Sequence, residues 1–239
     1  KPLGRSAKDF GETAYKLALG GCPLIKDDHS LFNQSYAPFK DRVKACVDSV
    51  NNANTKTGGR SLYIANCTAD SMEFLERAMT AQELGAGGIM AAPGLLGLSI
   101  IRELSSAPDF HLPIFLHPCF SGPLVLSADS GVSPFCYYGQ FSRLAGADAA
   151  IFTSFGGRFP FTEEVCRKIC DGTETEMGGL RSIFPVPSGG MKWQLFKKMV
   201  QVYGPDAIFL VGGALLTESD DLTANMHFYF EKLNEAVNK

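Results

Sequence analysis

The sequence lacks three features that would place it at once in a large class of proteins. It has no basic surplus, since its formal net charge is −3 over 239 residues, and a protein that mainly binds nucleic acid needs a basic surface. Its seven cysteines show no metal-finger spacing. No signal peptide is visible at its start. The sequence therefore predicts neither a nucleic-acid partner nor a zinc finger.

A membrane span is also missing, although one uncharged run has the length for it. Residues 84–101 carry no charge, but six helix-breaking residues interrupt them: Gly85, Gly87, Gly88, Pro93, Gly94 and Gly97. This run predicts a strand, a turn and a helix, and we expect no membrane partner. The odd, scattered cysteines fit reduced thiols in the cytoplasm or another reducing compartment. Targeting cannot be predicted, because we expect the natural N-terminus to be missing.

What the chain does contain is a regular alternation of short apolar strands and helices. With 45% hydrophobic and 20% charged residues, it has the composition of a globular protein with one large core. Strands are predicted at 22–27, 61–65, 88–92, 113–116, 149–152, 182–186 and 207–211. Helices are predicted at about 6–19, 39–52, 70–84, 95–104, 135–144, 162–170, 191–203 and 220–236, with Ser6 and Asp70 as caps.

The alternation fits either a doubly wound sheet or an eight-stranded barrel. The strands are short and continuously apolar, as parallel strands covered on both faces are. Eight helices in a (β/α)₈ TIM barrel require eight strands, and the first strand is absent from this sequence. We therefore expect residues 1–239 to form one α/β barrel domain, a fragment of a longer chain whose first strand lies upstream.

The most informative stretch runs from Gly20 to His29. Its apolar strand ends in four polar residues, Lys26-Asp27-Asp28-His29, which could bind a metal ion or move a proton. The carboxyl ends of parallel strands are where α/β proteins usually carry their chemistry. The simpler interpretation is a solvated salt bridge between Lys26 and Asp27 or Asp28.

Other polar and glycine residues follow the remaining strands, so a barrel would bring them to the same rim. Paired glycines after the last two strands predict a phosphate site, because their bare backbone N–H groups can approach an anion; a simple turn is the alternative for each pair. Gly156 and Gly157 could hinge a lid that carries Arg158. The simpler interpretations of Lys1 and His117 are a carboxylate-paired lysine and a buried, satisfied histidine. The rim residues are Lys1, Asn66, His117, Thr153, Arg158, Ser188, Gly189, Gly190, Gly212 and Gly213.

These motifs resemble the C-terminal barrel of the RuBisCO large-chain superfamily along the whole chain. Residues 1–6 are similar to its lysine-proline opening, and residues 20–29 to its glycine-glycine…lysine-aspartate-aspartate-glutamate signature. Residues 185–190 and 211–213 resemble its two phosphate loops. Residues 117–122, His-Pro-Cys-Phe-Ser-Gly, are closer to RuBisCO-like proteins (form IV) than to the carboxylase. The resemblance implies that an α+β domain precedes the barrel.

Departures from the carboxylase pattern decide the activity that the resemblance implies. Pro118 replaces an arginine, and Arg158 aligns roughly with the lid lysine. Phe152 or Thr153 stands where the carboxylase has a second histidine. The resemblance therefore implies an enolase or isomerase acting on a phosphorylated keto-sugar or a methionine-salvage substrate, not CO₂ fixation. The alternative is a degenerate RuBisCO-like pseudoenzyme that serves as a structural subunit.

The resemblance also implies residue roles. Lys26 would be carbamylated and hold Mg²⁺ together with Asp28, with His29 in the position of the third ligand. Lys1 would be the general base, and His117 would contact a phosphate or a substrate hydroxyl. The substrate and its phosphate would be bound by Asn66, Arg158, Ser188, Gly189, Gly190, Gly212 and Gly213. His29 is a departure, because imidazole suits zinc, iron, nickel or copper better than Mg²⁺. Either the metal differs or the site binds none. By analogy with the family, we expect a homodimer or a higher assembly.

Overall fold

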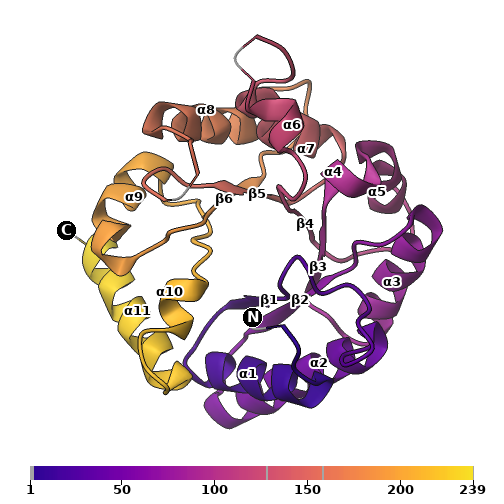
Figure 1. Cartoon of the computed structure of the whole chain (residues 1–239), viewed down its shortest axis with the longest axis vertical. Helices are drawn as coiled ribbons and strands as arrows, with labels where there is room; N and C mark the ends of the chain where they lie inside the picture. Colours follow the sequence, from indigo (N-terminus) through magenta and orange to yellow (C-terminus); the bar gives the residue numbers. More distant parts are fainter. Residues whose placement is uncertain (1–2, 128, 158, 239) are drawn as a thin grey trace.

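The computed structural model describes residues 3–127, 129–157 and 159–238. Its centre is a curved sheet of six parallel strands, hydrogen-bonded to one another in the order of the sequence (Figure 1). This order is the one a barrel requires, and the prediction of a parallel α/β barrel fold is confirmed. No predicted boundary of these strands is wrong by more than two residues. The strands are β1 (Leu24–Lys26), β2 (Leu62–Asn66), β3 (Gly88–Ala91), β4 (Ile114–Leu116), β5 (Ala149–Thr153) and β6 (Phe184–Ser188).

The predicted seventh strand, 207–211, runs beside β6 but completes only part of a ladder. Ile208 N donates to Pro185 O at 3.0 Å, and Leu210 N donates to Pro187 O at 3.1 Å. One parallel bridge joins Ser188 and Leu210. The two prolines of β6 accept these bonds but have no N–H groups to donate in return. The prediction of a regular strand at this position is therefore wrong, because the prolines of the neighbouring strand β6 cannot complete the ladder.

Helices surround the sheet on its outer side (Figure 1). The first begins at a capping box formed by Ser6 and Asp9, which confirms the predicted cap. Asp70 stands at the predicted start of the third helix, but its side chain makes no capping hydrogen bond. The helices are α1 (Ala7–Leu19), α2 (Phe39–Thr57), α3 (Ser71–Glu83), α4 (Pro93–Leu96), α5 (Leu98–Ser105), α6 (Gly122–Val125), α7 (Ser142–Leu144), α8 (Glu163–Glu174), α9 (Phe196–Tyr203), α10 (Gly213–Leu216) and α11 (Leu222–Val237), with a 3₁₀ turn at Trp193–Leu195.

The helix predicted at 135–144 is present but begins as a π-helix, Phe135–Phe141, before it continues as α7. The backbone here packs closely against α8: a Cβ atom on Gly139 would lie 2.4 Å from the backbone of Gly172. A single wide turn leaves no distinct period in the sequence, so hydrophobic spacing could not reveal it.

The sheet separates an inner core at the centre of the barrel from an outer core under the helices. Side chains that point inward form a small core at the centre of the barrel. The alternate side chains pack under the helices in two larger clusters. The inner core consists of Ile64, Met90, Phe115, Ala149, Ile151 and Val186, with Leu24, Ile208 and Leu210 packed against it.

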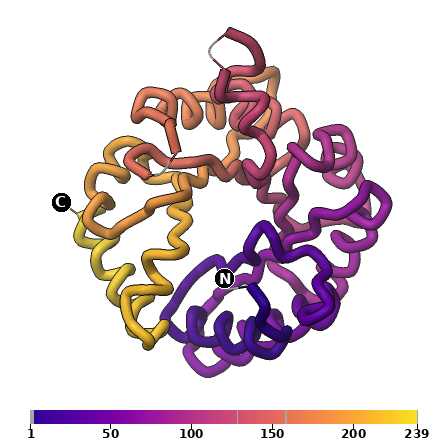
Figure 2. The backbone as a smooth tube through the Cα atoms, viewed as in Figure 1, coloured from indigo at the N-terminus to yellow at the C-terminus, as the bar shows by residue number. Residues whose placement is uncertain are grey.

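The first and the last of the described helices, α1 and α11, lie side by side in the outer layer (Figure 2). Thr223 Oγ1 donates to Lys16 O at 3.0 Å. Gly20 has no room for a side chain, because a Cβ atom there would lie 2.6 Å from Met226 Cβ. Within the described ranges, no strand pairs with the other edge of β1. None of the helices described is both long and apolar enough to cross a membrane.

Candidate active site

The alternation of the strands determines which side chains reach the interior at the carboxyl end of the barrel. Because side chains on a strand repeat every two residues, the residue two positions after an inner-core residue faces the same side. Ile64, Phe115, Ile151 and Val186 belong to the inner core. The same rule applied to each strand places these residues at the interior rim: Lys26, Asn66, His117, Thr153 and Ser188.

The side chains of Lys26 and Asp28, at the end of β1, have different hydrogen-bond partners. Lys26 Nζ donates to the backbone oxygen of Asp27 at 2.6 Å. The Asp28 carboxylate accepts from both the backbone N–H (3.1 Å) and the hydroxyl (2.5 Å) of Ser30. Asp27 is buried and pairs with Arg42 through Nε at 3.2 Å. The simple alternative, a solvated salt bridge at the strand end, therefore does not describe Asp27.

His29 and His117 come together from two different loops. Their rings stack with centroids 4.5 Å apart and planes inclined by 15°. His29 Nδ1 lies 3.6 Å from Asp28 Oδ1. His117 Nδ1 accepts a hydrogen bond from the Cys119 backbone N–H at 3.1 Å, which assigns the proton of the neutral ring to Nε2. His117 is only half-buried, so the interpretation of a fully buried histidine does not hold.

Asn66 is fully buried, with 0% of its surface exposed. Its amide nitrogen donates to the backbone oxygens of the loop that carries Asp28 and His29. Its amide oxygen accepts from the backbone and hydroxyl of Thr68. In this structure Asn66 supports the loop, and the predicted contact with substrate stays a prediction.

The residues predicted to bind phosphate lie on neighbouring segments. Gly189 and Gly190 both have positive φ angles, +81° and +82°, in the region that favours glycine. The Ser188 hydroxyl donates to the backbone oxygen of Phe152 at 2.8 Å. Gly212 and Gly213 have no atom within 4 Å of the place where a side chain would begin, and α10 starts at Gly213. This arrangement leaves bare backbone on both segments.

The predicted hinge glycines touch this phosphate loop. A Cβ atom on Gly190 would lie 2.8 Å from Gly157 Cα, and one on Gly157 would lie 2.5 Å from Gly189 O. The loop after β5 therefore rests directly on the loop after β6. Arg158, predicted to be the lid cation, and Lys1, predicted to be the general base, lie outside the described residues.

Of the two residues aligned with the carboxylase histidine, Phe152 points away from the interior. It is fully buried among aromatic rings, with centroids 6.5 Å from Tyr138 and 5.9 Å from Tyr203. Thr153 faces the interior instead, beside Ser188 of the next strand. Period-two counting along the strand would have given this assignment from the sequence.

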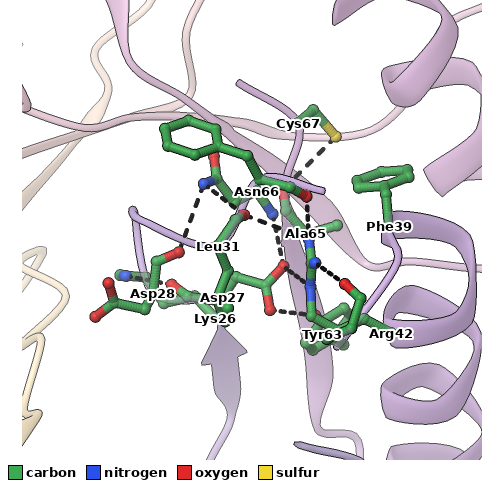
Figure 3. A network of polar contacts seen from close by, with 12 residues as sticks. Lys26, Asp27, Asp28, Leu31, Phe39, Arg42, Tyr63, Ala65, Asn66 and Cys67 are labelled. Carbon is green, nitrogen blue, oxygen red and sulfur yellow. Dashed lines mark hydrogen bonds and ion pairs between the residues drawn. The ribbon is translucent and has the colours of Figure 1, made fainter. Parts of the chain in front are cut away.

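Sequence reasoning missed the buried network below the rim, in which Arg42 and Tyr63 both contact Asp27 (Figure 3). A signal for it was present. Arg42 lies on the apolar face of α2 with Phe39, Val43 and Cys46, so it had to be buried, and a buried arginine needs an acidic partner.

The donor set at the end of β1 does not fit Mg²⁺ as it stands. Among the residues in the described ranges, no three His, Cys, Asp or Glu side chains are grouped to hold a metal ion. Asp28 offers oxygen, His29 offers nitrogen, and an unmodified Lys26 is a cation, whereas Mg²⁺ prefers oxygen ligands. The carbamate on Lys26 would add oxygen donors, and it stays a prediction.

Comparison with known proteins gives one consistent result. The family of the ribulose bisphosphate carboxylase large chain, catalytic domain, matches residues 1–225. The 5-methylthioribulose-1-phosphate isomerase of Rhodospirillum rubrum is 35% identical over 227 residues, which cover 93% of this chain and 58% of that protein. The 2,3-diketo-5-methylthiopentyl-1-phosphate enolase of Geobacillus thermodenitrificans is 34% identical over 213 residues, which cover 89% and 52%.

The solved structures agree with the sequence matches. A rubisco-like protein from Alicyclobacillus acidocaldarius superposes with a TM-score of 0.92 at 29% identity, covering 100% of this chain and 60% of that one. The match to this chain thus spans 52% of the length of the enolase and 60% of the length of the rubisco-like protein. The similarity therefore extends to most of the barrel described above.

Proposed function

This chain belongs to the family of the RuBisCO large-chain catalytic domain, and on that premise we propose that it is a RuBisCO-like enolase or isomerase. Its substrate would be a phosphorylated keto compound of the methionine-salvage type, such as those in the names of its relatives. Fixation of CO₂ is not proposed, because the residues that the carboxylase pattern requires are replaced at Pro118 and at the end of β5.

The observation that carries the proposal is the stacked pair of His29 and His117 at the carboxyl end of the barrel. Enolisation needs one group to remove a proton from the carbon next to a carbonyl, and another to donate a proton to the carbonyl oxygen. His117 carries its proton on Nε2 and can donate it. His29 Nδ1 lies 3.6 Å from Asp28 Oδ1, and a proton on Nδ1 would leave Nε2 of His29 to act as the base.

Because the two rings are stacked 4.5 Å apart, they suit a substrate whose reacting carbon lies next to the carbonyl group. Lys1, the base that the family resemblance implies, is a competing assignment for the first step. Loss of proton abstraction in Lys1→Met but not in His29→Gln would assign the step to Lys1, and the opposite result would assign it to His29.

The two glycine segments support a phosphate anchor on the other side of the rim. Gly212 and Gly213 have no atom within 4 Å of the place of a Cβ atom, so their backbone can approach an anion, and Gly189 and Gly190 lie on the neighbouring segment. A phosphate held there would place the keto end of the substrate toward β1 and β4. Binding energy from the phosphate would then orient the reacting carbon at the histidine pair.

Mg²⁺ with carbamylated Lys26 remains part of the proposal only as something to be tested. When bound, the metal would stabilise the negative charge that develops on the enolate oxygen. The steps assigned to His29 and His117 do not require it. A requirement for another divalent metal would fit the imidazole of His29 better than a requirement for Mg²⁺.

Assembly and location are also proposals. Exposed apolar side chains around α4 and α6 support a homodimer or higher assembly: Leu95, Phe120, Leu124 and Leu126. All seven cysteines are free, which supports a reducing compartment.

The test is to incubate the intact protein separately with 5-methylthioribulose 1-phosphate, 2,3-diketo-5-methylthiopentyl 1-phosphate and ribulose bisphosphate plus bicarbonate, and to follow products by ¹H and ³¹P NMR. We expect conversion of one of the first two. Carboxylation of ribulose bisphosphate would contradict the proposal. No conversion and no binding of any of the three would favour the structural-subunit alternative.

A further inference from the structure

We infer that Arg42 and Asn66 are positioning residues that hold the main chain of residues 28–31, and through it hold His29 against His117. The catalytic consequence rests on the proposed function, whereas the positioning itself is a property of the described chain. Both residues are fully buried, and their described hydrogen bonds go to the loop and to neighbouring protein groups. Their effect would pass through the loop.

Asn66 holds the loop from the end of β2. Its Nδ2 donates to His29 O and Leu31 O, both at 3.0 Å, with a longer contact of 3.5 Å to Asp28 O. Its Oδ1 is fixed in turn by Thr68, at 2.9 Å from the hydroxyl and 3.2 Å from the backbone N–H. The amide therefore cannot rotate without breaking contacts on both sides.

Arg42 holds the same loop from α2. Its guanidinium donates to Leu31 O at 3.4 Å, Phe32 O at 3.2 Å and Ala37 O at 3.1 Å. The guanidinium also lies over the Phe39 ring, 5.6 Å from its centroid. A planar fork with five fixed N–H donors can hold three carbonyl groups and the Asp27 carboxylate at once, whereas a lysine has only three N–H donors.

Asp27 connects Arg42 and Asn66, the two residues that hold the loop (Figure 3). Its carboxylate accepts from Arg42 Nε at 3.2 Å, from the Asn66 backbone N–H at 3.0 Å, and from the Tyr63 hydroxyl. Burial alone would lower the pKa of Arg42, but the negative charge of Asp27 raises it overall. The arginine thus stays charged.

These bonds converge on a stretch that has no regular structure of its own. Leu31 O accepts from both Arg42 and Asn66, and Asp28 and His29 lie just before it in the chain. Backbone groups in such a loop have no ladder or helix to fix them. The position of the His29 ring therefore depends on these two buried side chains.

The chain offers a matched control for each residue at the opposite end of the barrel. Asn54 pairs with the backbone of Ser61 through its Nδ2 (2.9 Å) and its Oδ1 (2.8 Å), just before β2 begins. Arg143, 4% exposed, donates to backbone oxygens of the segment before β6, including Arg181 O at 2.9 Å and Leu180 O at 2.7 Å. Both controls hold backbone but are far along the strands from the rim.

The experiment compares Asn66→Ala with Asn54→Ala and Arg42→Lys with Arg143→Lys in the intact protein. The first readout is the ¹H–¹³C NMR spectrum of the histidine rings, assigned with His29→Gln and His117→Gln. Stacked rings shift each other's signals. We expect Asn66→Ala and Arg42→Lys to lose this mutual shift, while both control variants keep it.

The second readout separates kcat from KM for the substrate that the wild-type protein converts. A displacement of about 1 Å costs about 100-fold in rate, so we expect kcat to fall about 100-fold in Asn66→Ala while KM changes less than about twofold. Asn54→Ala should keep both within about twofold. Arg42→Lys keeps a charge beside Asp27, so a loss of kcat there with the fold retained separates positioning from stability.

Unchanged ring signals and unchanged kcat in Asn66→Ala would overturn the inference, as would equal losses in Asn54→Ala. If the wild-type protein converts no substrate, the proposed function fails, and the NMR comparison still decides whether these residues position the loop.

Discussion

Two buried arginines at opposite ends of the barrel both hold loop backbone, but the partners of their guanidinium groups differ. Arg42 holds the loop that follows β1, at the carboxyl end of the strands, and Arg143 holds the segment that precedes β6, at the amino end. Within the described part of the chain, the hydrogen bonds of the Arg143 guanidinium go to backbone oxygens. Arg42 also pairs with Asp27, a carboxylate that is itself buried.

The difference shows what the carboxyl end requires. A loop can be held by neutral carbonyl groups alone, as the amino end demonstrates. A buried charge pair costs desolvation and seldom adds net stability, so its presence is better explained by the geometry that it enforces. The carboxyl end also carries Phe120, the non-glycine residue with positive φ among those described, directly after the His117 turn. Strain and buried charge thus gather at the rim where the reaction is proposed.

The largest expected effect contrasts the two arginines. Arg42→Met should lower the free energy of unfolding by about 3–5 kcal/mol, because it leaves the charge of Asp27 buried and unpaired. Arg143→Met should cost about 2–3 kcal/mol, because it removes hydrogen bonds without stranding a charge. Urea unfolding measures both.

A double variant sharpens this contrast. Adding Asp27→Asn to Arg42→Met should recover about 1–3 kcal/mol, because the stranded charge is then removed as well. Equal losses in the two arginine variants, with no recovery in the double variant, would show that Asp27 gives Arg42 no distinct role.

The next effect concerns activity rather than stability. His29→Ala should lower kcat by about 100-fold or more, because proton transfer by a positioned imidazole contributes at least that much. Its stability should hardly change, because the His29 side chain is 39% exposed. His227→Ala, an exposed histidine on α11, is the control and should retain full kcat. Retained activity in His29→Ala would move the proton transfer to another residue.

A smaller effect compares two glycines with left-handed backbones. Gly190→Ala places a Cβ atom 2.8 Å from Gly157 Cα, whereas Gly204→Ala, at φ +77°, meets nothing within 4 Å. Both should lose about 1–3 kcal/mol of stability from backbone strain. Only Gly190→Ala should also raise KM for the phosphorylated substrate, by about tenfold, because the phosphate loop must shift. A similar KM change in Gly204→Ala would argue against a phosphate site at Gly190.

The last prediction concerns how the stability of the protein depends on alkaline pH. Burial raises the pKa of Cys46 and of Cys170 to about 12. In the unfolded chain a thiol has a pKa of about 8.5, so the unfolded state loses these protons first. The contribution of each buried thiol to the free energy of unfolding is thus intact below about pH 8.5 and is lost as the pH rises toward about 12.

The corresponding slope is about 1.4 kcal/mol per pH unit for each thiol. Cys46→Ala and Cys170→Ala should each reduce the alkaline slope of the unfolding free energy by this amount. A markedly larger change of slope in Cys46→Ala would mean that the negative charge of Asp27 raises the pKa of Cys46 more than expected. This charge is the next cause of the raised pKa after burial.

Much of this fold could be predicted from local sequence. Continuous apolar runs bounded by glycines located the strands of the sheet, and the polar residues after them located the rim. The seventh strand failed because the prolines at 185 and 187 affect a neighbour in space, which a local pattern does not register. The short helices α6 and α10 were missed because four residues are too few to show a helical period.

The sequence predicted which described residues follow the strands at the carboxyl end, but not the contacts that they make. Nothing in the sequence indicates that His29 stacks on His117, because the two residues lie on different loops. The buried role of Asn66 is likewise set by a loop that begins 38 residues earlier. Arg42 is an exception, since its place on an apolar helical face revealed its burial and its need for an acidic partner.

The measurement that tests the account most directly is solvent exchange at the carbon next to the substrate carbonyl. The intact protein would be incubated in D₂O with 5-methylthioribulose 1-phosphate and with 2,3-diketo-5-methylthiopentyl 1-phosphate, and deuterium uptake would be followed by ¹H NMR. We predict exchange of that proton with one of them, and its loss in His29→Ala. No exchange with either substrate, in wild-type protein that binds them, would contradict enolisation at this rim.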